Sequence, residues 1–124
     1  MTEFTRRDPD LEIDPSAPPS GEGCRECLEE SAGWWVHLRR CAACGHIGCC
    51  DSSPAQHATA HYRDTGHPIM VSFEPGERWG WDFQTEAVIK HGPDLAPPTD
   101  RPQDQGSPAP AERVPENWLE LIHR

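Results

Sequence analysis

The chain has 124 residues, of which 14 are proline and 10 are glycine, and it carries a formal net charge of −10. This length supports one small domain, which buries too little apolar surface to fold without a disulfide or a metal. The acidic charge argues against a surface that follows a phosphate backbone, so we expect no nucleic-acid partner. No apolar run approaches a signal peptide or the ~20 residues of a membrane span, so we expect a cytoplasmic protein without a membrane partner.

The first half of the chain is predicted to contain a flexible arm, a cysteine turn and a strand. Residues 1–23 are polar, acidic and proline-bearing, which is typical of a solvated arm. A Cys-x-x-Cys pair follows at 24–27, where two sulfurs can meet one metal ion. Aromatic and β-branched residues then predict a strand over 34–40. Strand alternation would place Trp34, Val36 and Leu38 on one face, and Trp35, His37 and Arg39 on the other.

The second half begins with another Cys-x-x-Cys pair at 41–44 and a short strand over 46–49. A helix is predicted over about 54–65, because Ser53 can cap it and Gly66 is a natural C-terminal residue. Further strands are predicted over 68–73, 78–83 and 86–90.

The end of the chain differs in composition from the part that precedes it. Residues 24–91 form the predicted domain, and residues 92–112 are rich in proline, aspartate and glutamine, which predicts a linker. Residues 113–124 predict a short amphipathic helix with Pro115 at its first position. We expect Trp118 of this helix to dock on the domain, because a lone exposed tryptophan is unusual.

Cysteines and histidines are concentrated in the middle of the chain. In a reducing compartment, Cys-x-x-Cys pairs near histidines are typical of metal sites. The nine candidate ligands are Cys24, Cys27, Cys41, Cys44, Cys49, Cys50, His57, His61 and His67. Two closed tetrahedral zinc sites need about eight ligands, so one of the adjacent Cys49 and Cys50 is spare. Helical spacing alone would turn His57 and His61 to one face and to one metal.

Several motifs occur in order over residues 24–89: Cys-x-x-Cys, Trp-Val-x-Leu-Arg-x-Cys-x-x-Cys-Gly-x-x-Gly-Cys, His-x-x-x-His and Thr-Gly-His-Pro. This run resembles the ubiquitin-protease-type (UBP) zinc finger. The resemblance implies a small α+β fold, in which two cross-braced zinc ions stabilise a twisted antiparallel sheet with one main helix and flexible Pro-rich ends. It assigns one zinc to Cys24, Cys27, Cys49 and His57, and the other to Cys41, Cys44, His61 and His67. The preference for arginine over lysine suggests a bacterial source.

The first function compatible with these residues is a protein-interaction module. Two closed zinc sites leave no coordination position for a catalytic water, so we expect a non-enzymatic monomer. Its aromatic groove would bind a protein or peptide tail, and the residues assigned to it are Trp35, Arg39, Asp51, Trp79 and Trp81. Ubiquitin-binding members of the family grip a free carboxylate with an arginine after the ligand cysteine. Cys50 and Asp51 follow it here, and an aspartate would repel a carboxylate, so strong ubiquitin binding is not expected.

The second compatible function is a redox response. The spare thiol at Cys50 or Cys49 lies next to a metal site and near a helix N-terminus, where a thiol pKa is lowered. Oxidation of this thiol would release zinc, and the partner would be a redox enzyme.

Overall fold

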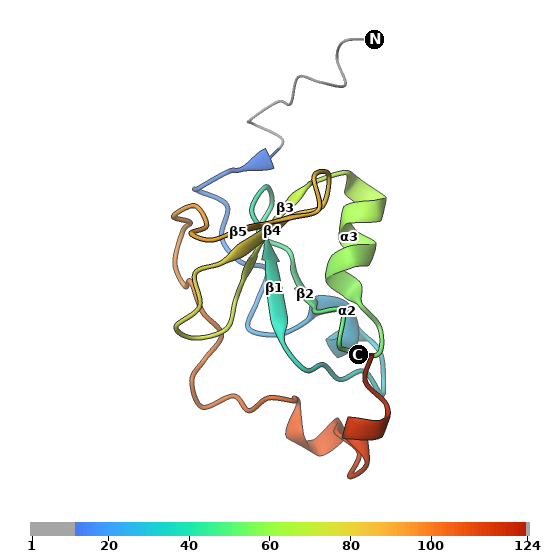
Figure 1. Cartoon of the computed structure of the whole chain (residues 1–124). Coiled ribbons are helices and arrows are strands. Elements are labelled where there is room, and N and C mark those ends of the chain that lie inside the picture. Colours follow the sequence, from blue (N-terminus) through green and yellow to red (C-terminus); the bar gives the residue numbers. More distant parts are fainter. Residues whose placement is uncertain (1–11, 124) are drawn as a thin grey trace.

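A computed structural model describes residues 12–123, and residues 1–11 of the predicted arm lie outside the described part. A five-stranded antiparallel sheet forms the centre, with the strands in the order β2-β1-β3-β4-β5 (Figure 1). The strands are β1 Leu38–Cys41, β2 Ile47–Cys49, β3 Ile69–Ser72, β4 Gly80–Asp82 and β5 Ala87–Ile89. A short helix α2 (Arg25–Glu29) packs on β2, and the main helix α3 (His57–Thr65) packs on β1 and β2. The predicted small α+β fold with one main helix is confirmed.

The strand predicted over 34–40 begins only at Leu38. Before that point, Trp35 leaves the sheet and bridges to Ala109 in the C-terminal part of the chain. The Trp35 N–H donates to the Ala109 carbonyl at 2.9 Å, and the Ala109 N–H donates to the Trp35 carbonyl at 3.0 Å. The predicted alternation therefore fails, because Trp35 and Leu38 pack in the same core cluster.

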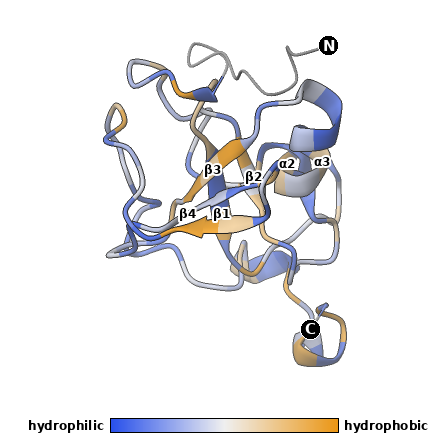
Figure 2. Cartoon of the chain, turned by 45° about the horizontal axis from the view of Figure 1, so that its top comes forward, coloured by the Kyte–Doolittle hydropathy of each residue, from blue (hydrophilic) through white to orange (hydrophobic). Residues whose placement is uncertain are grey.

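That core cluster is largely built around the sulfurs and the sheet. Its members are Cys24, Cys27, Trp35, Leu38, Ile47, Cys49, Phe73 and Ala109. Apolar residues lie along the central strands, whereas α3 is mostly polar (Figure 2), and none of its 9 residues is buried. A helix of this length is not stable alone in water. Its attachment therefore depends on a few contacts, among them the stacking of Tyr62 on Phe83 at 4.6 Å and the histidines described below.

The main helix starts at His57, three residues later than predicted from Pro54. Ser53 is buried instead of capping the helix, and its hydroxyl accepts a hydrogen bond from the Val36 N–H at 2.8 Å. The residue before the helix, Gln56, adopts a left-handed conformation with φ 55° and makes no side-chain cap. The predicted end at Gly66 is correct, since Gly66 has φ 78° and its N–H donates to the Tyr62 carbonyl.

The described part of the predicted N-terminal arm is packed on the domain. Asp14 N–H donates to the Ala42 carbonyl and Ser20 N–H to the Gly45 carbonyl, both at 2.8 Å. Gly45 has φ +83°, and a Cβ on it would lie 1.9 Å from the Pro18 carbonyl oxygen. Only glycine therefore allows the arm to approach the turn between β1 and β2 this closely.

The predicted linker 92–112 is also part of the fold. The Arg101 N–H donates to the Phe73 carbonyl at 2.7 Å, and Ala109 pairs with Trp35. Beyond it, the predicted C-terminal helix is replaced by two 3-10 turns, η2 (Ala111–Arg113) and η3 (Trp118–Glu120). Proline-rich composition indicated solvated chain here, but backbone hydrogen bonds hold these segments on the domain.

One buried carboxylate joins three of these segments. Glu74 accepts hydrogen bonds from the Leu38 N–H at 3.0 Å, from Arg101 Nε at 2.9 Å and from His37 Nδ1 at 3.2 Å. Burial raises the pKa of Glu74, but the hydrogen bonds from His37, Leu38 and Arg101 outweigh it and hold the pKa below its usual value. The ionised carboxylate therefore stabilises the start of β1 and the 92–112 segment together.

We predict that Glu74→Gln lowers the free energy of unfolding by about 3 kcal/mol, because it leaves the partner Arg101 without its counter-charge. Denaturant titration of the zinc-loaded protein at pH 7 measures the change. The low pKa means that the stabilisation is present above the ordinary glutamate pKa and is lost as pH falls through the folded value. The difference in the free energy of unfolding between the wild type and Glu74→Gln should therefore become smaller at acid pH. Glu112→Gln, at an exposed glutamate, is the control, and an equal loss in both variants would contradict the assignment.

Candidate metal centre

The first cluster of donor atoms lies where α2, β2 and α3 meet. It contains the predicted set Cys24, Cys27, Cys49 and His57, whose donor atoms all lie within 4.8 Å of one another. His57 Nδ1 lies 3.2, 3.3 and 3.5 Å from the sulfurs of Cys24, Cys27 and Cys49. The sulfurs of Cys27 and Cys49 are 3.9 Å apart. All three cysteines are fully buried.

The second cluster joins the end of β1 and the following turn to the middle of α3 and the chain after it. It contains Cys41, Cys44, His61 and His67, again with donor atoms within 4.8 Å of one another. Cys41 Sγ lies 3.6 Å from His67 Nδ1, and Cys44 Sγ lies 3.3 Å from His61 Nε2. His57 and His61 thus belong to different clusters, although helical spacing alone would have grouped them.

Both donor sets fit a tetrahedral zinc ion. Zinc bonds of about 2.3 Å to sulfur and about 2.0–2.1 Å to nitrogen place tetrahedral S···S pairs about 3.8 Å apart and S···N pairs about 3.5 Å apart. The distances of 3.9 Å between sulfurs and 3.2–3.6 Å between sulfur and nitrogen are close to these values. The residue types are those of structural zinc sites. We therefore assign one zinc ion to each set, with four protein ligands and no open position.

The pKa values of the cysteines in each cluster also favour a bound divalent cation. Hydrogen bonds from the thiols of Cys24 and Cys27 lower the pKa of Cys49 to about 2. Hydrogen bonds to Cys24 and Cys49, together with burial, raise the pKa of Cys27. In the second cluster, Cys44 has its pKa lowered to about 3, chiefly by a hydrogen bond from Cys41. Each cluster therefore favours one thiolate and resists a second, until a divalent cation replaces the remaining protons.

Polar neighbours orient the histidine ligands. A carboxylate oxygen of Glu30 lies 3.5 Å from His57 Nε2, the ring nitrogen that faces away from the sulfurs. The His46 ring stacks on His61 at 4.0 Å, and His46 Nε2 lies 2.7 Å from the Glu26 carboxylate. Neither Glu26 nor Glu30 was predicted from the sequence as a partner of these histidines. Glu26 lies on α2 next to Cys27, and Glu30 directly follows the helix, so this short segment contacts histidines at both clusters.

The structure distinguishes the two adjacent cysteines. Cys49 lies in the first cluster, and its sulfur also accepts the His57 N–H at 3.2 Å. Cys50 points to the other side of the chain, where it packs with Trp34 and Val36 and lies 3.5 Å from the Ser53 hydroxyl. Neighbouring side chains of an extended segment face opposite ways, so only one of the two sulfurs can reach the metal.

Residues 24–93 match the family model described as "Zn-finger in ubiquitin-hydrolases and other protein". The chain belongs to this zinc-finger family. It is also similar to the solution NMR structure of protein RPA1320 from Rhodopseudomonas palustris, with 38% identity and a TM-score of 0.59 over 80% of this chain and 97% of that one. No curated protein matches the sequence. Within residues 12–123, no helix has the length and apolar character needed to cross a bilayer.

This zinc finger carries a groove of about 240 Å³ beside the metal sites. The groove lies between the sheet, the loop after β2 and the start of α3. Its lining residues are Arg39, Cys50, Asp51, Ser52, Ala58, Thr59, Met70, Trp79, Trp81 and Phe83. Four of the five residues predicted for peptide binding are therefore brought together. The other six lining residues were missed, and only the alternation of β3 could have indicated one of them, Met70; the rest are Cys50, Ser52, Ala58, Thr59 and Phe83.

The fifth predicted residue, Trp35, does not line the groove. Its bridge to Ala109 turns it into the core, where it is 2% exposed. The ring edge lies so close to Gly23 that a Cβ there would meet it at 2.6 Å. The prediction that Trp35 and Arg39 share one face is thus wrong, because the strand does not extend back to Trp35.

Two polar contacts shape the groove of this zinc finger. The Arg39 guanidinium lies 4.6 Å from the ring centre of Trp79, within the range of a cation–π interaction. Asp51 Oδ1, which also lines the groove, accepts a hydrogen bond from the Thr59 hydroxyl at 2.5 Å. The groove therefore presents aromatic rings together with one cation and one anion, each held by a neighbouring side chain.

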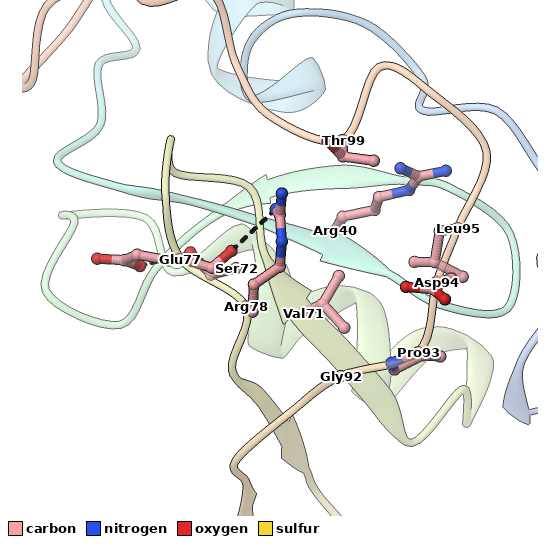
Figure 3. A pocket seen from close by; sticks show the side chains of 10 residues that line it. All are labelled: Arg40, Val71, Ser72, Glu77, Arg78, Gly92, Pro93, Asp94, Leu95 and Thr99. Carbon is pink, nitrogen blue, oxygen red and sulfur yellow. Dashed lines mark hydrogen bonds between the residues drawn. The ribbon is translucent and has the colours of Figure 1, made fainter.

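A second cavity, of about 130 Å³, lies on the other face of the sheet, under the 92–99 segment (Figure 3). Arg40 lines it, but this side chain is 1% exposed and donates to the carbonyls of Ala17 at 2.8 Å and Pro98 at 3.2 Å. Arg40 therefore ties the two terminal segments to β1. We assign this cavity to the fold and not to a ligand.

We predict two zinc ions per chain, both structural, because two complete donor sets hold an otherwise small core. Each site contributes about 10 kcal/mol of folding free energy in peptide models, so chelation should unfold residues 24–89 cooperatively. Metal analysis and circular dichroism during chelator titration measure both effects. A content of one or three ions per chain would contradict the assignment.

We also predict that Cys49→Ser loses one zinc ion, whereas Cys50→Ser keeps both, because only the Cys49 sulfur lies in a cluster. Native mass spectrometry of the two variants counts the ions. The pair is matched, since the same substitution is made at adjacent buried positions. Loss of zinc from Cys50→Ser with retention in Cys49→Ser would reverse the assignment.

Proposed function

We propose that this zinc finger is a non-catalytic protein-interaction module, whose groove binds a segment of another protein. The observation that carries the proposal is the grouping of Trp79, Trp81, Met70 and Phe83 along one concave surface. All four side chains are partly exposed, so a ligand can bury them further without unfolding the domain. Aromatic residues and methionine are enriched at protein interfaces for this reason.

The two zinc ions would act on this function only through the fold. Four protein ligands fill each site, so neither ion has a position for substrate or water. When bound, zinc supplies a fixed tetrahedral junction. The chain's own residues do the rest: the clusters hold α3 against the sheet, and α3 in turn presents Ala58 and Thr59 as one wall of the groove.

The charges of the groove support a partner other than a free ubiquitin tail. Asp51 lies on the wall, fixed by Thr59, and its charge would repel a terminal carboxylate. A lost charge-assisted contact together with a repulsive one costs roughly 1–3 kcal/mol. A segment with apolar side chains and a neighbouring positive charge suits these walls better. The net charge of −10 favours the approach of such a segment.

A redox response through Cys50 is the second candidate function. It is supported by the position of Cys50 next to the ligand Cys49, and a redox enzyme would be the partner. Against it, Cys50 is 5% exposed, so an oxidant reaches the sulfur only after a local opening. None of the 6 cysteines forms a disulfide, which supports our proposal of a protein in the reducing cytoplasm.

We predict that a peptide ending in free Gly-Gly binds weakly, and no better than its amidated form, because Asp51 opposes the carboxylate. Titration of labelled protein measures both affinities. Asp51→Arg should make binding depend on the free carboxylate and strengthen it by about tenfold or more. Micromolar binding of the free-ended peptide to the wild type, lost on amidation, would refute the proposed partner class.

The same proposal can be tested with partners that are not chosen in advance. Peptides selected from a displayed library on the wild-type protein should lose binding to Trp79→Ala. Leu28→Ala, at a side chain that is 47% exposed on α2 and does not line the groove, is the control and should bind as the wild type does. Selected peptides that bind Trp79→Ala unchanged would place the interaction elsewhere on the domain.

A further inference from the structure

The C-terminal segment 111–123, which we call the strap, lies outside the matched zinc-finger region of residues 24–93. It packs on a patch that contains Cys50. Val114, Trp118 and Ile122 of the strap cover Trp34, Val36 and Cys50 of the domain. Cys50 also lines the groove, so the apolar surface of the groove continues beneath the strap.

The strap is attached to the groove wall itself. The His123 N–H donates to the Ser52 carbonyl at 3.0 Å, and His123 Nε2 lies 3.3 Å from the Pro54 carbonyl oxygen. Ser52 lines the groove next to Asp51. The last residues of the strap therefore hold the same loop that forms one side of the candidate binding site.

The other end of the strap is anchored beside the first metal cluster. Arg113 Nη1 lies within hydrogen-bonding distance of the carbonyls of Cys27 at 2.8 Å, Glu30 at 3.0 Å and Gly33 at 3.2 Å. The carbonyls at and after a helix C-terminus lack partners within the helix, so a guanidinium there is well satisfied. This anchor fixes where the strap starts, whether or not the rest of it is docked.

Few features of its own secondary structure or packing stabilise the strap in its docked position. Its regular structure within the described residues consists of two 3-10 turns of 3 residues each, and 3-10 turns are weakly bonded. Leu119 and Leu121 are 55% and 47% exposed. Segments of this kind open at lower free energy than the core to which they are attached.

We propose that the strap is a hinged cover, which when docked shields Cys50 and holds Ser52 of the groove loop through His123, and when undocked exposes Cys50 and removes that one attachment of the loop. Its effect on ligand binding rests on the proposed function. The shielding of Cys50 does not, because it follows from packing alone. The strap thus couples the chain beyond the zinc finger to the wall of its binding site.

The test compares full-length, zinc-loaded proteins in their reaction with a maleimide, with Cys50 as the reporter thiol. Trp118→Ala should raise the rate of Cys50 alkylation by about tenfold or more, because it removes the largest side chain that packs over the patch. Leu121→Ala, in the same segment with an exposed side chain, should leave the rate unchanged. Peptide mapping identifies the alkylated residue, and the double variant Cys50→Ser, Trp118→Ala should lose the fast phase.

Zinc content and peptide binding are measured on the same samples. Fast alkylation of Cys50 in Trp118→Ala, with both zinc ions retained, supports the proposal that the strap is a hinged cover. An unchanged rate of alkylation in Trp118→Ala contradicts this proposal. A fast rate accompanied by zinc loss also contradicts it, because the strap would then be needed to keep the zinc-bound domain folded. If Cys50 becomes reactive in Trp118→Ala but no displayed peptide binds the wild type, the proposed function of the groove is wrong, and the proposal that the strap shields Cys50 is supported.

Discussion

The attachment of α3 to the sheet is the constraint on which the rest of this structure depends. The helix buries none of its own residues, yet it supplies His57 and His61, one to each metal cluster. The partner sulfurs come from the start of α2, from the turn after β1 and from the end of β2. Two metal ions therefore attach this helix to the sheet, whereas in a larger domain an apolar helix face makes that attachment. The groove exists only because α3 is held at this distance from the sheet.

Charged side chains play the corresponding role for the proline-rich segments. Arg40 and Arg113 donate to backbone carbonyls from distant parts of the chain, and Arg101 donates to the carbonyl of the neighbouring Pro102 and to the distant Glu74 carboxylate. Glu74 provides the counter-charge for Arg101 and the acceptor for the first N–H of β1. Proline contributes no N–H, so segments of this composition cannot join a sheet as inner strands. They can still pack closely when arginines and a few backbone pairs satisfy their carbonyls.

The zinc sites and the groove meet in the stretch from Cys49 to His57. Cys49 and His57 are assigned to the metal, while Cys50, Asp51 and Ser52 between them line the groove. Ser53 then ties the stretch to the Val36 N–H, and the C-terminal strap ties it to the end of the chain. A loop fixed at both ends by metal ligands can present its central residues with little freedom. That arrangement suits recognition, because little order has to be gained on binding.

Residue types and their spacing were enough to predict the metal ligands, the two Cys-x-x-Cys turns, the central strands and the end of α3 at Gly66. These features depend on residues close together in the chain, so spacing and composition carry them. The division of His57 and His61 between two metals came from the family resemblance, since helical periodicity gave the opposite grouping. The position of Trp35, the late start of α3 and the packing of the proline-rich ends could not be predicted in this way. Each of these depends on a contact between distant segments, such as Trp35 with Ala109 or Ser53 with Val36. Such a contact outweighs the local preference because it gives hydrogen-bond partners to backbone groups that the fold buries and that would otherwise be left unpaired.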